Sequence, residues 1–296
     1  MARACPACGR PNADAAVKCL YCVAPLPPAE ARATVAVEAS SEKHLLILLP
    51  SGARDETAIA ALSRIAAVSA YDARLSLSAV RPRLFRRVDH EAEAWRLSEE
   101  LSRAGIAHYV VSEASVMSLP IARAAAFDFG ERQIEVTADG TTAATPYGNL
   151  FLLVRGEITR ERHDERKVGS AKGASRRLTP GLRLHLYARD ATAAVEVDPD
   201  LFDFRFLEED RTASSILNLE KLIARLVQRA PSVILDRGFD QEPLVLSRAG
   251  VEDVTDALAV TDRGPSGVPY DDEASFRFYS RWRYRVARHL HLRESG

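Results

Sequence analysis

Residues 90–112 read HEAEAWRLSEELSRAGIAHYVVS and hold the clearest helix of the chain followed at once by a strand. Asp89 is placed to cap a helix over 90–103, and Gly105 is placed to end it. The residues from 106 to 112 are rich in β-formers. Apolar residues recur at helical spacing along one face of the helix, namely Ala94, Leu97, Leu101 and Ala104. A helix that returns directly into a strand predicts an α/β unit.

The pattern upstream completes this unit. An apolar run over 44–49 predicts a buried strand, two helical segments follow over 55–66 and 71–80, and residues 84–88 predict a second strand. The expected order over residues 43–115 is therefore β-α-α-β-α-β. This order resembles the C-terminal domain of the bacterial ribosomal stalk protein. The resemblance implies that fold, but Ala60 and Ala61 replace the docking face of that family, so it implies no activity here.

Residues 123–245 predict a β-rich domain closed by a helix. Residues 134–137 lead into Asp139-Gly140, a pair typical of a type I′ hairpin turn. Further strands are expected at 150–154 and 182–187. A period-two pattern predicts one more strand, with its core face formed by Phe202, Phe204 and Phe206. Strands followed by an amphipathic helix over 214–230 resemble pleckstrin-homology-like folds, which implies a peptide-docking sheet edge beside the helix.

Within this domain, residues 156–181 are highly charged. Seven lysines and arginines and three acidic residues lie between Thr159 and Arg177. We predict a solvated loop here, because the segment is highly charged and rich in glycine, serine and arginine. The alternative is a grip on nucleic acid phosphates, but the segment has no aromatic residue on which bases could stack.

The four cysteines all lie in the first 22 residues, as Cys5-Pro-Ala-Cys8 and Cys19-Leu-Tyr-Cys22. The spacing C-x2-C-x10-C-x2-C predicts one structural Zn²⁺ held by four thiolates. A closed site of this kind leaves no position for a reactive water. The alternatives are a disulfide framework, which suits a secreted protein better, and a redox-active C-x-x-C pair, which is expected near a β-α-β pattern that this segment lacks.

The segment over residues 3–26 also resembles the short zinc ribbon that opens many bacterial regulatory and envelope-associated proteins, through Cys-Pro-x-Cys-Gly at 5–9 and the second cysteine pair. That resemblance implies a structural metal. We expect a ribbon over 1–26 that depends on zinc to fold. A proline-containing linker over 27–42 then leads to the next domain.

The last part of the chain, residues 246–296, predicts a linker followed by an amphipathic helix over 274–292. Its arginines fall on one face and its large apolar residues on another: Phe276, Tyr279, Trp282, Val286 and Leu290. A strand is the competing interpretation, because residues 281–286 alternate strictly. We favour packing of the helix against its own domain over docking to a partner or to an anionic surface, since exposing this much aromatic surface promotes aggregation.

Composition narrows the function. The 296 residues carry a net charge of −1, with 47% hydrophobic residues, which is typical of a globular protein and not of a fibrous or wholly disordered one. The patterns described above predict the fold class, which is multidomain α+β. No apolar run predicts a membrane span or a secretory signal, which leads us to expect a cytoplasmic protein. No catalytic motif is present, and we expect neither an enzyme nor a small-molecule substrate. The expected function is a zinc-ribbon adaptor that binds another protein, and the alternative is a nucleic-acid- or ribosome-associated factor.

Overall fold

The structure is a computed structural model that describes residues 42–50, 55–168, 171–241 and 272–294, with short pieces of the first 24 residues (2–4, 8, 11–13, 18, 22 and 24). For residues 2–4, 11–13, 160–168, 171–179 and 293–294 it describes the backbone alone. The chain divides into two compact units, Met1–Ser41 and Glu42–Gly296. Both helices and sheets are present, so the α+β class is confirmed.

In the first unit, two short strands form an antiparallel pair. β1 (Ala2–Ala4) pairs with β2 (Pro11–Ala13), with Arg3 opposite Asn12. The chain that connects the two strands carries Cys5 and Cys8.

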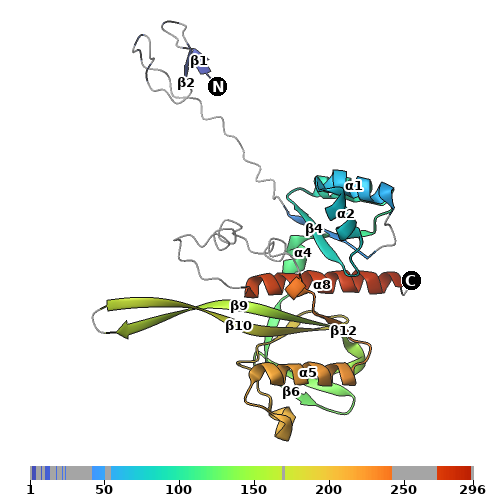
Figure 1. Ribbon diagram of the computed structural model, residues 1–296, viewed down its shortest axis with the longest axis vertical. Coiled ribbons are helices and arrows are strands. Elements are labelled where there is room, and N and C mark those ends of the chain that lie inside the picture. The colour runs from blue at the N-terminus through green and yellow to red at the C-terminus, as the bar shows by residue number, and fades with distance from the viewer. Residues whose placement is uncertain are drawn as a thin grey trace. The chain divides into compact units, whose positions relative to one another are not determined.

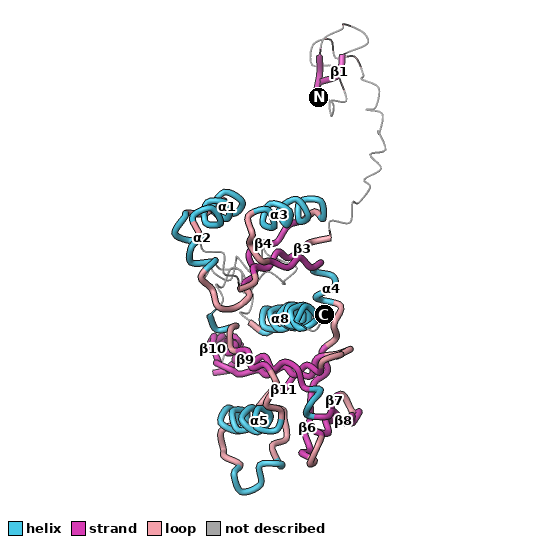
Figure 2. The backbone as a smooth tube through the Cα atoms, turned by 90° about the vertical axis from the view of Figure 1, so that its right-hand side faces the viewer, coloured by secondary structure: helices cyan, strands magenta, loops and turns pink. Residues whose placement is uncertain are grey.

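The predicted β-α-α-β-α-β order is confirmed at the start of the second unit. The three strands form an antiparallel sheet in the order β4-β3-β5. Figure 2 shows the helices lying together on one face of this sheet. Leu46 and Leu48 of the central strand pack with Leu97 and Leu101 in that core. The elements are β3 (His44–Leu48), α1 (Glu56–Ala66), α2 (Ala70–Leu77), β4 (Arg83–Val88), α3 (Glu91–Arg103) and β5 (His108–Ser112).

The ends of α3 differ in part from the sequence prediction. His90, not Asp89, is the residue before the first helical turn, and it makes no capping hydrogen bond with its side chain. At the other end Gly105 adopts a φ of 67°, a left-handed conformation that glycine tolerates best. The predicted stop at Gly105 is therefore confirmed. A short helix, α4 (Glu113–Met117), follows β5 and is capped by Ser112.

A larger sheet of seven strands forms the rest of the body, in the order β12-β9-β10-β11-β6-β7-β8. Asp139 and Gly140 both have positive φ, at 47° and 78°, and join β7 to β8, as their sequence predicts. The strands are β6 (Ile121–Phe129), β7 (Gln133–Ala138), β8 (Thr141–Pro146), β9 (Leu150–Val168), β10 (Ala171–Ala188), β11 (Ala194–Val197) and β12 (Ile234–Asp236), with a turn of 3-10 helix, η1 (Tyr147–Asn149), before β9.

The prediction of a loop over 159–177 is wrong. β9 and β10 pair without interruption from Arg183↔Gly156 out to Ala171↔Val168, so the charged segment is a long antiparallel hairpin. A two-stranded ribbon with solvent on both faces needs no apolar alternation, so its composition cannot be told from that of a loop. We call residues 160–179, the part of the hairpin that extends beyond the body, the arm (Figure 1).

The strand predicted from the phenylalanine alternation is also wrong. Phe202 and Phe204 lie in irregular chain just before a 3-10 helix, η2 (Arg205–Asp210). Their rings are nevertheless buried, and they contact each other with centroids 4.9 Å apart. Phe202 and Phe204 therefore belong to the core, as expected, but they lie in irregular backbone and not in a strand.

Helix α5 (Ser215–Arg229) closes the β-rich part, as predicted, with Ser214 as its N-cap. Its apolar face packs on the sheet through Leu219, Leu222 and Leu226, and Figure 2 places it beneath the large sheet. After it come β12 and a last 3-10 turn, η3 (Phe239–Gln241).

The C-terminal segment is a helix, α8 (Glu273–Glu294), and it lies between the two sheets (Figure 2). The strand interpretation of 281–286 is wrong, and the expected packing against the chain's own body is confirmed. Phe276, Trp282 and Tyr284 are buried in one core with residues of both sheets, such as Leu45 and Leu152. Because α8 has a sheet on either side, it buries more of its circumference than a helix at the surface would.

Candidate interaction site

The four predicted metal ligands lie in the first unit. Cys8 and Cys22 are exposed, whereas Cys5 and Cys19 lie outside the described residues. No group of three or more histidine, cysteine, aspartate or glutamate side chains able to hold a metal occurs among the residues that the structure describes. The zinc site therefore stays a prediction from the cysteine spacing.

The arginines of the C-terminal helix are engaged within the chain. Arg277 donates two hydrogen bonds of 2.9 Å to the carboxylate of Glu196. Arg281 donates to the carbonyl of Leu119 at 2.8 Å, and Arg285 to that of Ser115 at 2.7 Å. These three side chains tie α8 to β11 and to the segment around α4. They are structural contacts rather than a cationic surface for phosphates.

Beneath α8 a chain of hydrogen bonds joins four buried polar side chains. Tyr187 Oη lies 2.7 Å from Ser280 Oγ, which lies 2.9 Å from His185 Nδ1. His185 Nε2 lies 3.1 Å from Glu196 Oε2. A hydroxyl, an imidazole and a carboxylate in this order are the parts of a hydrolytic triad.

Burial argues against catalysis by this triad. Ser280 and His185 have no exposed surface, and Glu196 is 1% exposed. None of the four side chains lines the groove described below. A substrate therefore has no route to the Ser280 hydroxyl, and the chain serves to satisfy polar groups that packing has buried.

The charge states of this network follow from its burial. Burial lowers the pKa of His185 by penalising the imidazolium form, against the opposing effect of its hydrogen bond to Glu196. Burial alone would raise the pKa of Glu196, but hydrogen bonds from His185 and Arg277 outweigh it and hold that pKa well below its usual range. A neutral His185 donates from Nε2 to the carboxylate and accepts at Nδ1 from Ser280, whose oxygen accepts from Tyr187.

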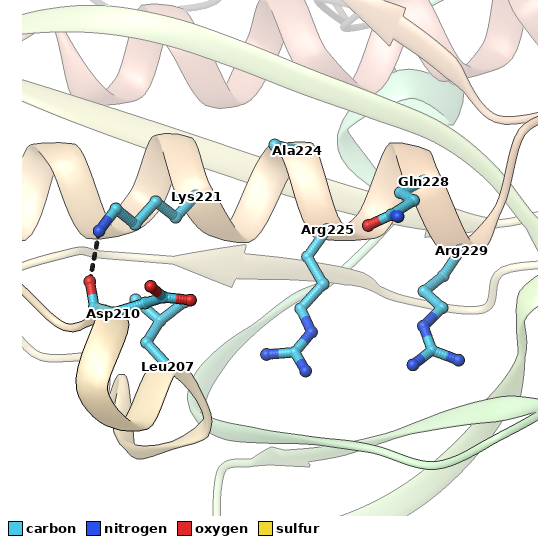
Figure 3. A pocket seen from close by; sticks show the side chains of 7 residues that line it. All are labelled: Leu207, Asp210, Lys221, Ala224, Arg225, Gln228 and Arg229. Atoms are coloured by element: carbon cyan, nitrogen blue, oxygen red, sulfur yellow. Dashed lines mark hydrogen bonds between the residues drawn. The ribbon is translucent and has the colours of Figure 1, made fainter.

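A concave surface lined by several charged side chains lies beside α5. It has a volume of about 730 Å³ and is lined by α5 and η2, as Figure 3 shows. Three cationic residues, Lys221, Arg225 and Arg229, recur every four residues along α5, so they lie on one side of the helix. Apolar Leu207 and acidic Asp210 come from η2. We call this surface the α5 groove.

The three cations differ in how firmly they are held. The ammonium of Lys221 donates a hydrogen bond to the backbone carbonyl of Asp210. The Arg225 guanidinium donates to the carbonyl of Phe206 at 2.9 Å and lies 5.0 Å from the ring centre of Phe129. Arg229 is exposed, and Figure 3 shows its guanidinium extended in the same direction as that of Arg225. Arg225 is thus positioned by its neighbours, and Arg229 is available to a ligand.

This arrangement suits a ligand that carries carboxylates and some apolar surface. A guanidinium binds a carboxylate in a bidentate fashion. The positions of Lys221 and Arg229 are separated by eight residues, or about 12 Å of helix, which matches three or four residues of an extended peptide. The side chains of the groove hold no nucleophile paired with a base.

The α5 groove was not predicted from the sequence. The helix over 214–230 was expected only to close the domain through its apolar face. The signal was present on another side of the helix, where basic residues occur at 221, 225 and 229. These basic residues could not be recognised as part of a site from the sequence, because η2 forms the other wall of the groove only in the folded chain.

Comparison with known proteins adds no relative. No family model, no curated protein and no solved structure matches this chain. No helix of the described residues has the length and apolar character needed to cross a membrane.

Proposed function

We propose that the chain is a non-enzymatic adaptor of the cytoplasm, with a zinc ribbon at its N-terminus and a body that binds an acidic segment of another protein in the α5 groove. The observation that carries the proposal is the exposed guanidinium of Arg229 beside the anchored guanidinium of Arg225. Arg225 packs against the rings of Phe129 and Phe206, and arginine is enriched among the residues that dominate protein interfaces.

The number of cations favours a peptide over a nucleic acid at this surface. The ammonium of Lys221 and the guanidinium of Arg225 already donate hydrogen bonds to backbone carbonyls, and Arg229 is the exposed one of the three cations. Binding of nucleic acid draws on many phosphate contacts at once. A short acidic peptide needs only one or two carboxylate contacts together with apolar burial.

The test is a binding titration with a fluorescent eight-residue peptide of alternating glutamate and leucine. We expect Arg229→Glu to weaken binding at least tenfold, because it removes a carboxylate contact and adds repulsion. Arg103→Glu is the matched control, since Arg103 is 66% exposed and lies on α3. Equal affinity of the Arg229→Glu protein and the wild type would refute the groove.

The zinc ribbon is supported by the spacing of Cys5, Cys8, Cys19 and Cys22 and by the pairing of β1 with β2, which flank the first cysteine pair. We expect one equivalent of zinc per chain by elemental analysis. Cys5→Ser should abolish it, since three ligands do not form a closed structural site. Because Met1–Ser41 forms a unit of its own, the unfolding midpoint of the body should not move when a chelator is added. Absence of stoichiometric zinc would exclude the ribbon.

A further inference from the structure

The arm is a two-stranded ribbon that leaves the body at a defined point. Beyond Asp236↔Val154 on one side and Leu184↔Val197 on the other, no third strand pairs with β9 or β10 among the described residues. Each strand of the arm has nine residues with described backbone, which is about 30 Å of extended chain. Figure 1 shows the arm projecting from the side of the body.

The base of the arm is held firmly. The backbone of Thr159 bonds to Asp272 through both its groups, with the carbonyl accepting from the Asp272 N–H at 3.2 Å and the N–H donating to Asp272 Oδ2 at 3.3 Å. Ile158 is 1% exposed in the core shared with α8. Gly156 lies so close to the ring of Phe276 that a Cβ there would clash. The body therefore fixes the direction in which the arm leaves.

The arm concentrates positive charge. It contains seven lysines and arginines against three acidic residues, whereas the whole chain has a net charge of −1. The register sets Lys167 directly opposite Lys172, and Arg162 directly opposite Arg177. Like charges at directly opposite positions destabilise a strand pair. A polyanion bound along the ribbon would neutralise these paired cations, whereas the arm alone has no such compensating charge opposite them.

Four arginines fall at register positions on the same face of the ribbon. Residues directly opposite each other and residues two apart share a face. By this rule Arg160, Arg162, Arg166 and Arg177 share one face with a single acid, Asp164. The other face has three cations and two acids, and so less net charge: Lys167, Lys172, Arg176, Glu161 and Glu165.

Charge also decides between the occupants of such a ribbon. A second copy of the chain would bring another strongly cationic arm against this one, so pairing of the two arms is opposed by repulsion. Single strands bind through aromatic stacking as well as charge, and the arm has no aromatic residue. The major groove of B-form DNA admits a two-stranded ribbon, whereas that of A-form RNA is too narrow for side chains to read.

We propose that the arm, residues 160–179, binds duplex DNA, with the face that carries Arg160, Arg162, Arg166 and Arg177 against the phosphates. This inference goes beyond the adaptor function and does not depend on the α5 groove. Because the arm and the α5 groove are separate cationic surfaces, one chain would be able to hold an acidic protein segment and DNA at the same time.

The experiment is fluorescence anisotropy of the full chain with a labelled 24-base-pair DNA of mixed sequence. Neutralisation of about four phosphates predicts a slope of about −3.6 in a plot of log affinity against log salt, or roughly a 150-fold loss from 50 to 200 mM. The triple variant R160Q/R162Q/R177Q should weaken binding at 50 mM salt at least tenfold and flatten the slope.

Two further variants make the result specific. R96Q/R103Q/R205Q removes three exposed arginines elsewhere on the body and should change affinity less than twofold. The second replaces residues 160–179 by Asn-Gly, which joins Thr159 directly to its partner Pro180 by a two-residue turn. It should keep the unfolding midpoint of the wild type and lose DNA binding.

Several outcomes would overturn the proposal. One is no binding of the wild type to DNA at 50 mM salt, and another is equal affinity of the arm variant and the control variant. Binding to vesicles with 30% phosphatidylserine but not to DNA would assign the arm to a membrane surface instead. Retained DNA binding after removal of the arm would move the site to another part of the chain.

Discussion

The hydrogen-bonded chain under α8 makes a quantitative prediction for Ser280→Ala. The hydroxyl of Ser280 joins Tyr187 Oη to His185 Nδ1, at 2.7 and 2.9 Å, and all three side chains are fully buried. Alanine at position 280 leaves the Tyr187 hydroxyl without an acceptor and His185 Nδ1 without a donor. Each such group costs about 1–3 kcal/mol, so the free energy of unfolding should fall by about 2–6 kcal/mol.

Urea unfolding at pH 7.5, followed by tryptophan fluorescence, measures this loss, because Trp282 lies on the same helix and is buried. At about 2 °C per kcal/mol for a body of this size, the melting midpoint should fall by about 4–12 °C. Ser76→Ala is the matched control. Its hydroxyl donates to the carbonyl of Asp72 at the surface of α2, and its loss should cost less than about 0.5 kcal/mol.

A double-mutant cycle with Tyr187→Phe tests the mechanism. Phenylalanine keeps the stacking on Tyr284, whose ring centre lies 4.6 Å away, and removes the donor that Ser280→Ala would leave unsatisfied. The double variant should therefore be more stable than the sum of the two single losses predicts, by about 1 kcal/mol. Strict additivity, or a cost of Ser280→Ala no larger than that of the control, would refute this account of the network.

Three further predictions concern pH, packing and the core. The pKa of His185 in the folded chain lies below the 6.5 of the unfolded chain, so the neutral imidazole contributes its full stabilisation above pH 6.5 and loses it as the pH falls below 6.5. Urea unfolding between pH 7.5 and 5 should show the free energy of unfolding falling by up to about 1.4 kcal/mol per pH unit, and His185→Gln should lack this decrease. In Gly156→Ala the new methyl group would lie 2.8 Å from Phe239 Cδ1. The variant should lose its near-ultraviolet circular dichroism signal and about 1–3 kcal/mol in the free energy of unfolding. Gly148→Ala is the control and should lose neither, because the space around Gly148 is open. Trp282→Ala should cost about 3–5 kcal/mol in urea unfolding, since the indole is 1% exposed; a cost below 1 kcal/mol would show that α8 is not part of the core.

Local features of the fold could be predicted because they depend on neighbouring residues. The helix over 90–103 and its end at Gly105 follow from apolar spacing and from the backbone freedom of glycine. The turn at Asp139-Gly140 follows from the same freedom. The phenylalanine pattern failed as a strand prediction because period-two spacing also occurs in irregular chain that covers a core.

The candidate sites depend on contacts between distant residues. The α5 groove needs η2 to fold against Arg225, and the triad-like network brings together residues 185, 196 and 280. Periodicity shows that a face is apolar or basic, but it does not show which other segment will cover that face. Arg277 and Arg281 illustrate this, because their helical spacing is that of a cationic surface and the fold gives them partners inside the chain.

By itself, the amino-acid sequence determined the periodic elements, the tight turns and the cysteine pattern, because each of these is set by residues a few positions apart. Only the tertiary structure decided that α8 lies between two sheets, that the strands over 160–168 and 171–179 form a ribbon and that α5 borders a groove. The physical reason is that burial and strand pairing are long-range choices, made by whichever surfaces can exclude water together.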